Sequence, residues 1–261
     1  MIKKIKTKMK TFLKIILFIA LFSLGFYVLK NQGPLFFYNN KMLVDDAVGT
    51  GWVYSVVGIV FGIFSAFVIL TEAERWSNLV DSIKKEVGEI NEMWLWSRHL
   101  PKSLKDKFEK NIKEILKDIV SGDWGKGEGA QKSSKTEKIL DSIHNDICRI
   151  PKGNSALITS IHDSFSDFIK YREERIHYVS FRLPKILKYT LIFNDFLIIF
   201  LSLLIGIKNI NLEYTFMISI ATLGYLIYLV VDDLDNPTVK GGWHITTEDY
   251  EQLLHKINSS K

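Results

Sequence analysis

The sequence predicts an all-α membrane protein with four transmembrane helices and a helical cytoplasmic bundle. Hydrophobic residues make up 47% of the 261 residues, and most of them are concentrated in four windows. The windows are residues 12–29, 47–71, 189–207 and 214–231, and their only charged residues are Lys14 and Asp195. A helix of about 20 apolar residues crosses a hydrocarbon core of about 30 Å, so each window is long enough to span a bilayer. This distribution excludes an ordinary cytosolic enzyme.

The first window follows a basic segment, a combination that also occurs in secretory signal peptides. Because no small-residue cleavage site follows it, we interpret residues 12–29 as a retained transmembrane helix. The first ten residues carry five lysines, whereas the connection to the second window combines two lysines with Asp45 and Asp46. Positive charge marks the cytoplasmic side of a span, so both termini are expected in the cytoplasm of a multi-pass plasma (inner) membrane protein.

We divide the chain into four parts on this basis. Residues 1–71 hold the N-terminal tail and the first two spans, and residues 72–188 form a cytoplasmic helical region. Residues 189–231 hold spans three and four, and residues 232–261 form an acidic segment and a short amphipathic helix. The net charge of +5 follows the positive-inside bias and gives no sign of nucleic-acid binding, because no basic stripe with interleaved aromatic residues stands out.

The cytoplasmic region is expected to be helical. Apolar residues recur every three or four positions through residues 72–100, so the second span should continue without a break into water. A further helix is expected from Pro101, with an apolar face made of Leu104, Phe108, Ile112, Ile115 and Ile119. A glycine-rich loop over 121–135 and helices over 136–150 and 155–183 should follow. Pro184 should mark a bend or a restart before the third span.

An acidic segment follows the fourth span. Asp232, Asp233 and Asp235 lack the glycine turn and distal glutamate of a calcium loop, so we expect solvated acids at a helix end. Their position is unusual, because the dipole at a helix C-terminus disfavours negative charge. Thr246, with Asp249 three residues later, has the pattern of a capping box that opens the last helix.

The residues give little indication of enzyme chemistry. No paired catalytic groups suggest themselves, and we expect neither an enzyme nor a cofactor. His144 and Cys148 lie four residues apart, but a zinc site needs three or four ligands and no second pair is near in sequence. We therefore expect no metal site.

Asp195 is an ionisable residue inside the third span. A charge at that depth is costly unless it faces protein or water. Two interpretations remain open, namely a hydrogen-bonded packing residue beside Asn194 and a participant in an ion path.

The second span carries two patterns. Its small residues form a stripe that would let another helix approach closely, and they are Gly51, Ser55, Gly58, Gly62 and Ala66. Beside the stripe, Ile59, Ile63 and Phe67 recur every fourth position. If several copies of this helix surround an axis, these three positions form stacked apolar rings that gate by dewetting. The alternative is an ordinary face that meets lipid or the protein core.

The spacing of Ile59, Ile63 and Phe67 resembles that of the pore-neck residues in the bestrophin channels. In that family three apolar neck residues four apart are followed, eight positions after the last, by Arg-Trp, and here Phe67 is followed at that spacing by Arg75 and Trp76. The acidic segment with Pro237 is similar as well. Further likeness to a bacterial bestrophin-like branch comes from Glu72-Ala73-Glu74, Arg172 and Arg175, the Pro184 junction and the closing short helix.

This resemblance implies a homopentamer with a pore on its five-fold axis, embedded in a lipid bilayer and passing small inorganic ions. Anions such as chloride are the commonest cargo of the family, and bacterial relatives can pass cations. Asp45 and Asp46, at the outer mouth, would favour cations. The sequence departs from the family at Ser77, where a second Trp is usual, and after Pro237, where Phe-Gly is missing, and the calcium clasp of animal members does not carry over.

A second hypothesis belongs to a different class. The chain would be a non-conducting membrane scaffold or sensor whose cytoplasmic helices bind a partner, with amphipathic faces around Trp76, Trp94 and Trp96.

Overall fold

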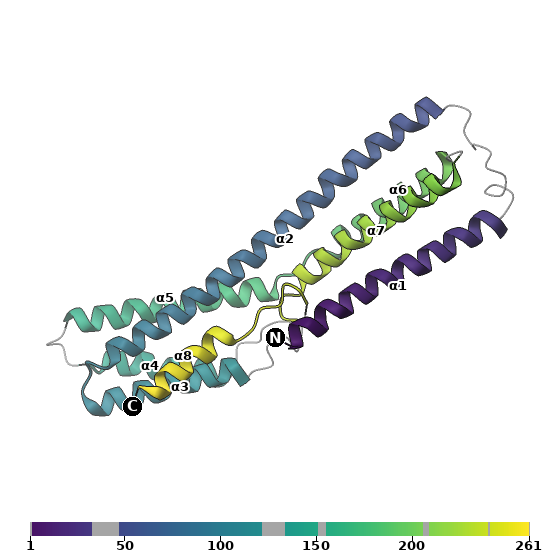
Figure 1. Ribbon diagram of the computed structural model, residues 1–261. Helices are drawn as coiled ribbons and strands as arrows, with labels where there is room; N and C mark the ends of the chain where they lie inside the picture. The colour runs from purple at the N-terminus through teal and green to yellow at the C-terminus, as the bar shows by residue number, and fades with distance from the viewer. Residues whose placement is uncertain are drawn as a thin grey trace. The chain divides into compact units, whose positions relative to one another are not determined.

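The computed structural model is all-helical over the residues it describes, which are 2–32, 47–121, 134–150, 155–205, 209–239 and 241–260. Figure 1 shows the order of the helices along the chain. They are α1 (Ile2–Gln32), α2 (Ala47–Ser97), α3 (Lys102–Ser121), α4 (Ser134–Cys148), α5 (Ser155–Ser180), α6 (Lys185–Ile205), α7 (Ile210–Asp235) and α8 (Glu248–Ser259). No strand occurs in these ranges, so the predicted all-α class is confirmed.

The chain forms two compact units. The first unit comprises Met1–Ala73, Leu183–Asn236 and Lys240–Trp243, and the second comprises Glu74–Arg182, Pro237–Val239 and His244–Lys261. The continuous helix α2 contributes residues to both, as the sequence predicted for the region after residue 71.

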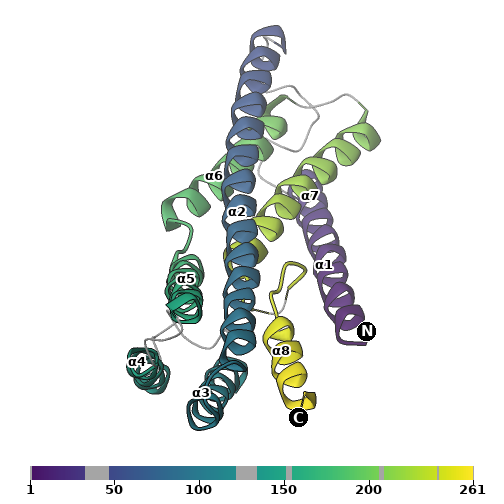
Figure 2. The ribbon, with the colours of Figure 1, turned by 90° about the vertical axis from the view of Figure 1, so that its left-hand side faces the viewer.

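The first unit consists of α1, α6, α7 and the first half of α2. Helices α6 and α7 run side by side in Figures 1 and 2. Helix α1 packs on α7 through aromatic pairs, with the Phe18 and Tyr225 rings stacked at 4.2 Å between centroids. A small apolar core gathers Val68 of α2 with Leu191 of α6 and Val231 of α7. Helices satisfy their own backbone hydrogen bonds, which is the requirement that hydrocarbon imposes on a spanning segment.

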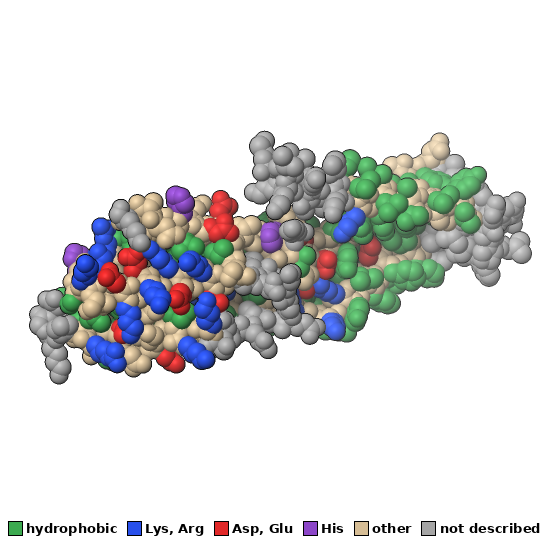
Figure 3. Space-filling view, turned by 90° about the horizontal axis from the view of Figure 1, so that it is seen from below, with side chains coloured by type: hydrophobic (Ala, Val, Ile, Leu, Met, Phe, Trp, Pro, Cys, Tyr) green, Lys and Arg blue, Asp and Glu red, His purple; other side chains and the backbone are tan. Residues whose placement is uncertain are grey.

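The surface of the first unit is strongly apolar. Exposed side chains include Leu21 of α1 at 60% and Phe196 of α6 at 63%. In Figure 3 hydrophobic side chains crowd this unit, whereas Lys, Arg, Asp and Glu side chains are spread over the second unit. Among the described residues, two helical segments are long and apolar enough to cross a membrane, Gly51–Ser97 and Asn211–Asp235, and the apolar stretch Phe12–Val28 is shorter. The count of four spans stays a prediction.

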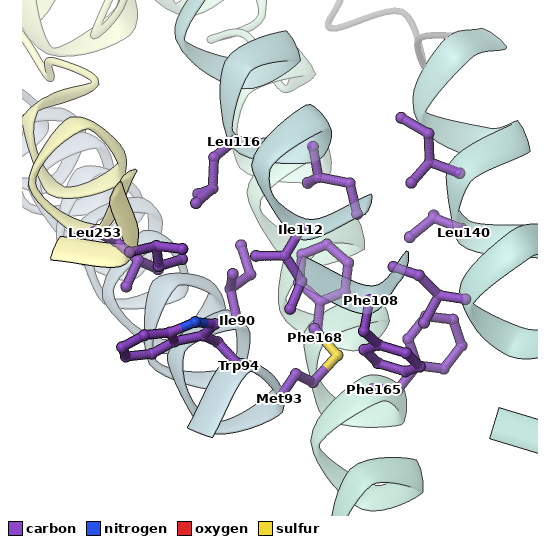
Figure 4. Close-up of a cluster of buried hydrophobic side chains, with 14 of the residues drawn as sticks. Ile90, Met93, Trp94, Phe108, Ile112, Leu116, Leu140, Phe165, Phe168 and Leu253 are labelled. Atoms are coloured by element: carbon purple, nitrogen blue, oxygen red, sulfur yellow. The ribbon is translucent and has the colours of Figure 1, made fainter. Parts of the chain in front are cut away.

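The second unit is a helical bundle made from the rest of α2 with α3, α4, α5 and α8. The face predicted for the helix after Pro101 is the one that packs, because Phe108, Ile112 and Ile115 are at most 1% exposed. Figure 4 shows Phe108 and Ile112 of α3 close to Met93 of α2 and Phe168 of α5. Burying a large apolar side chain contributes about 1.5–3 kcal/mol, so this core stabilises the bundle.

Several helix boundaries differ from the expectations. Helix α4 begins at Ser134, inside the expected loop, and α5 ends at Ser180, three residues early. A residue before proline avoids the helical conformation, in keeping with the non-helical chain over 181–184. Most of the expected glycine-rich loop, over 122–133, lies outside the described residues, as does the break at 151–154.

The predicted capping box on α8 is wrong. The N-cap is Thr247, one residue later than Thr246, and its side chain makes no capping bond to the backbone. Instead, the Thr247 hydroxyl donates to the Glu251 carboxylate at 2.7 Å. Three acidic residues in the first turn favour the helix by facing the positive end of its dipole.

Candidate functional site

The three predicted neck residues share one exposed face of α2. Ile59, Ile63 and Phe67 are 62%, 66% and 61% exposed. At 100° per residue they lie opposite the buried side of the helix. That side carries Phe61, Ser65 and Val68, which are 8%, 2% and 1% exposed. The described residues of the first unit therefore leave the neck face uncovered.

The small-residue stripe is also open. A Cβ atom added to Gly51, Gly58 or Gly62 would meet no described atom within 4 Å, and Ala66 is exposed. The stripe therefore packs against nothing that the structure describes in the same chain. Close helix packing along it, the role that the sequence suggests, stays a prediction.

Arg75 and Trp76 take different positions in the second unit. Arg75 is buried, and its Nη1 donates to the backbone carbonyl of Phe181, directly after the end of α5. A cation there complements the negative end of the helix dipole. Trp76 is half-buried and packs against the core of the bundle. Both residues thus hold elements of this unit together.

The predicted Pro184 junction is fixed from α7. The backbone N–H of Leu183 donates to Asp235 Oδ1 at 2.7 Å, and Lys188 reaches Asp235 Oδ2 at 2.8 Å. Asp235 is only 4% exposed. Lys188 also approaches Asp232 Oδ1 at 3.2 Å, so one ammonium bridges two carboxylates.

Asp233 holds the turn that follows α7. Its Oδ2 accepts from the backbone N–H groups of Gly242 at 2.7 Å and Trp243 at 3.2 Å. A Cβ atom on Gly241 would overlap the Asp233 carboxylate, so this approach requires glycine. The expectation of solvated acids is wrong for Asp235, which is buried, whereas Asp232 and Asp233 stay partly exposed. The carboxylates neutralise Lys188 and accept backbone N–H groups, which offsets the unfavourable helix dipole.

Sequence reasoning missed a buried charged cluster in the second unit. Glu86 of α2 is fully buried, accepts from Arg175 Nε of α5 at 2.5 Å, and accepts from the Tyr250 hydroxyl of α8 at 2.8 Å. Burial opposes the charge of Arg175, but the Glu86 carboxylate raises its pKa above the ordinary value. For Tyr250, burial raises the pKa well above its ordinary value, and the Arg175 charge partly offsets this rise. These groups tie three helices together.

A signal for this cluster was present in the sequence. Arg172 and Arg175 continue the apolar stripe of α5 that includes Phe165 and Phe168, and an arginine in such a stripe needs an acidic partner. The sequence around Glu86 does not mark it as buried, because Lys84 and Lys85 directly precede it.

Asp195 of α6 lies against α7. A Cβ atom on Gly224 would overlap its carboxylate, so the two helices meet closely at this point. Its Oδ1 is buried and has no hydrogen-bond partner within the described part of the chain. The packing interpretation and the ion-path interpretation of Asp195 therefore both stay predictions. Asp45 and Asp46 lie outside the described residues.

Comparison with known proteins identifies the class of fold. The chain resembles crystal structures of two variants of a bacterial bestrophin homologue from Klebsiella pneumoniae, with TM-scores of 0.72 and 0.74. The first variant is 12% identical in sequence, and the match covers 94% of this chain and 99% of that one. The second is 11% identical, and the match covers 95% of this chain and 97% of that one. A variant of a crystallised membrane protein is similar at a TM-score of 0.75 and 10% identity, over 94% and 98% of the two chains. These likenesses show the fold.

The family follows from the sequence. Residues 17–238 match the family model of the Bestrophin-like domain, which covers more than half of the chain. The protein therefore belongs to the Bestrophin-like family and is a membrane protein of helical fold. No curated protein matches the chain.

Proposed function

We propose that the protein is an oligomeric ion channel of the plasma (inner) membrane, in which one α2 helix from each copy lines a shared pore. Ile59, Ile63 and Phe67 form the neck of that pore. The observation that carries the proposal is the exposure of all three side chains on a face that the rest of the described chain leaves uncovered. Apolar rings at a constriction control conduction by dewetting.

The open small-residue stripe supports assembly. Glycines beside the neck face allow the α2 helices of neighbouring copies to approach closely. A pore made from one helix per subunit needs about five copies, which agrees with the homopentamer that the bestrophin resemblance implies. Both termini and the second unit lie in the cytoplasm in this arrangement, in keeping with the basic N-terminal segment.

The conducted ion is a small inorganic one. The family resemblance favours anions such as chloride. Asp45 and Asp46, which would stand at the outer mouth, favour cations through their negative charge. The reversal potential under a salt gradient decides between the two signs.

The scaffold hypothesis has less support than the channel. Trp94 is buried and Trp76 is half-buried against the bundle core, so the faces that suggested a docking partner are largely covered within the second unit. Only Trp96 of these three residues remains exposed, at 37%.

Single-channel recording of the purified protein in a planar bilayer tests the proposal. We expect Ile63→Ala to raise conductance or open probability, because a smaller side chain weakens the hydrophobic barrier. Ile186→Ala on α6 is the matched control, since Ile186 is 67% exposed and Ile63 is 66% exposed. The channel proposal fails if the parent and both variants pass no current under any voltage or salt gradient. The neck assignment fails if both substitutions change the current equally.

A further inference from the structure

The turn after α7 presents an exposed tryptophan at a fixed position. Trp243 belongs to the first unit and is 43% exposed. Its backbone N–H, with that of Gly242, donates to the Asp233 carboxylate in the last turn of α7. Gly241 allows this close approach, because any Cβ atom there would overlap that carboxylate. The structure therefore holds this residue against the end of the helix.

The same end of the unit marks the limit of an apolar segment. The candidate span Asn211–Asp235 ends in three aspartates, and Asp235 pairs with Lys188 in the first turns of α6. Next to Lys188 in sequence stands Tyr189, which is 64% exposed. One end of the α6–α7 pair thus combines exposed aromatic rings with the first charges that follow the apolar surface.

This combination matches the chemistry of the headgroup layer. An indole ring has an apolar body and a polar N–H, so tryptophan is enriched where hydrocarbon meets water. Burial in hydrocarbon would strand the neighbouring ionic groups, and full exposure to water would leave a large apolar ring hydrated. The headgroup region satisfies both parts.

We propose that Trp243 is a bilayer-interface anchor, with its indole among the phospholipid headgroups and its backbone fixed by Asp233. The acidic segment after α7 then has a role besides fixing the Pro184 junction. It sets the depth of the α6–α7 pair in the membrane. This role does not depend on conduction.

Fluorescence quenching by brominated lipids tests the anchor. The full chain is reconstituted in phosphatidylcholine vesicles whose acyl chains carry bromine either near the headgroup or near the bilayer centre. The difference between the parent and Trp243→Phe isolates the emission of Trp243. We expect this emission to lose more intensity to the shallow bromines than to the deep ones. If Trp243→Phe does not fold, Trp243→Tyr, which keeps a polar tip, replaces it.

A matched control comes from Trp96 of the second unit, which is 37% exposed. The emission difference between the parent and Trp96→Phe should lose no intensity to either brominated lipid. Asp233→Ala removes the carboxylate that accepts the backbone N–H of Trp243. This variant should show a smaller difference between quenching of Trp243 by the shallow bromines and by the deep ones. Two outcomes overturn the proposal. Quenching by aqueous iodide without lipid quenching places the ring in water, and protection from all quenchers places it against a second copy of the chain.

Discussion

Two kinds of glycine have opposite surroundings in the first unit. Gly224 of α7 faces the Asp195 carboxylate so closely that no side chain fits. Gly62 of α2 faces open space in the single chain. Contacts within the chain explain why position 224 is glycine. A glycine at position 62 is explained only if another copy of the chain packs on it.

We expect Gly224→Ala to destabilise the protein by about 1–3 kcal/mol, the usual cost of forcing extra volume into a packed site. The thermal unfolding midpoint in detergent, followed by circular dichroism, measures the effect. Asp195→Ala in the same chain should restore much of the loss, because it removes the group with which the new methyl collides. Gly88→Ala on α2, where a Cβ meets nothing within 4 Å, should be neutral or stabilising. Equal losses at the two glycines would contradict the close approach of α6 and α7.

Tyr250 predicts a specific dependence on alkaline pH. Its pKa is raised by burial in the folded state, so the folded chain keeps the phenolic proton at a pH where the unfolded chain loses it. The stabilising contribution is fully present below the unfolded value of about 10 and is lost as pH rises through the folded value. We expect the free energy of unfolding to fall more steeply above that pH in the parent than in Tyr250→Phe. Chemical unfolding of both proteins over an alkaline pH series measures this, and parallel slopes would refute the assignment.

At the scale of the elements, α2 stands out because it contributes residues to both units. Its first half exposes the neck face, and its second half is anchored in the bundle through Glu86. That anchor joins α2 to α5 by an ion pair and to α8 by the Tyr250 hydroxyl. The C-terminal helix is thereby fixed to the same helix that carries the proposed pore face.

We expect Glu86→Gln to reduce stability by about 3–5 kcal/mol, since it leaves the Arg175 charge buried without its counter-ion. Asp81→Asn on the same helix is the control. The Asp81 and Lys85 side chains lie 2.6 Å apart, but both are about half exposed to solvent, so losing this pair should cost far less stability than losing Glu86. Denaturant unfolding of the full chain compares the two variants. Losses of similar size would show that the buried cluster contributes no more than a surface pair.

Periodicity was sufficient to predict most helices and the apolar face of α3, because burial follows a 3.6-residue repeat. It could not predict the polar contacts made across helices. Asp233 meets Gly242 and Trp243 only once the chain turns back after α7, and no local pattern encodes that turn. The capping pattern at Thr246 failed for a related reason, because the neighbouring threonine serves equally well as the first residue before the helix.

The candidate site was predictable to a similar extent. The spacing of Ile59, Ile63 and Phe67 placed them on one face of the second helix, and the structure leaves that face exposed. The contacts that this face makes in an oligomer involve other copies of the chain. Neither the residue spacing nor the structure of one chain contains those contacts. The neck assignment therefore stays a proposal.

At the scale of the whole molecule, assembly gives the exposed faces of α2 a purpose. We expect Gly62→Leu to weaken the oligomer, because a bulky side chain blocks close approach of neighbouring helices. Native mass spectrometry in detergent measures the copy number. Gly25→Leu on α1, where an added Cβ also meets no described atom, is the control and should leave the copy number unchanged. An oligomer unaffected by either substitution would remove the stripe from the interface.

Oxidative cross-linking at position 63 tests most directly whether the neck face points toward a shared axis. The exposed Cys148 is first replaced by serine, and Ile63→Cys and Ile186→Cys are then compared in membranes. We expect oxidation to link copies carrying Ile63→Cys into covalent dimers and to lower their current, while Ile186→Cys stays monomeric on a denaturing gel. Cross-links through Ile186→Cys and none through Ile63→Cys would indicate that the neck face points toward lipid, which would contradict the proposed pore.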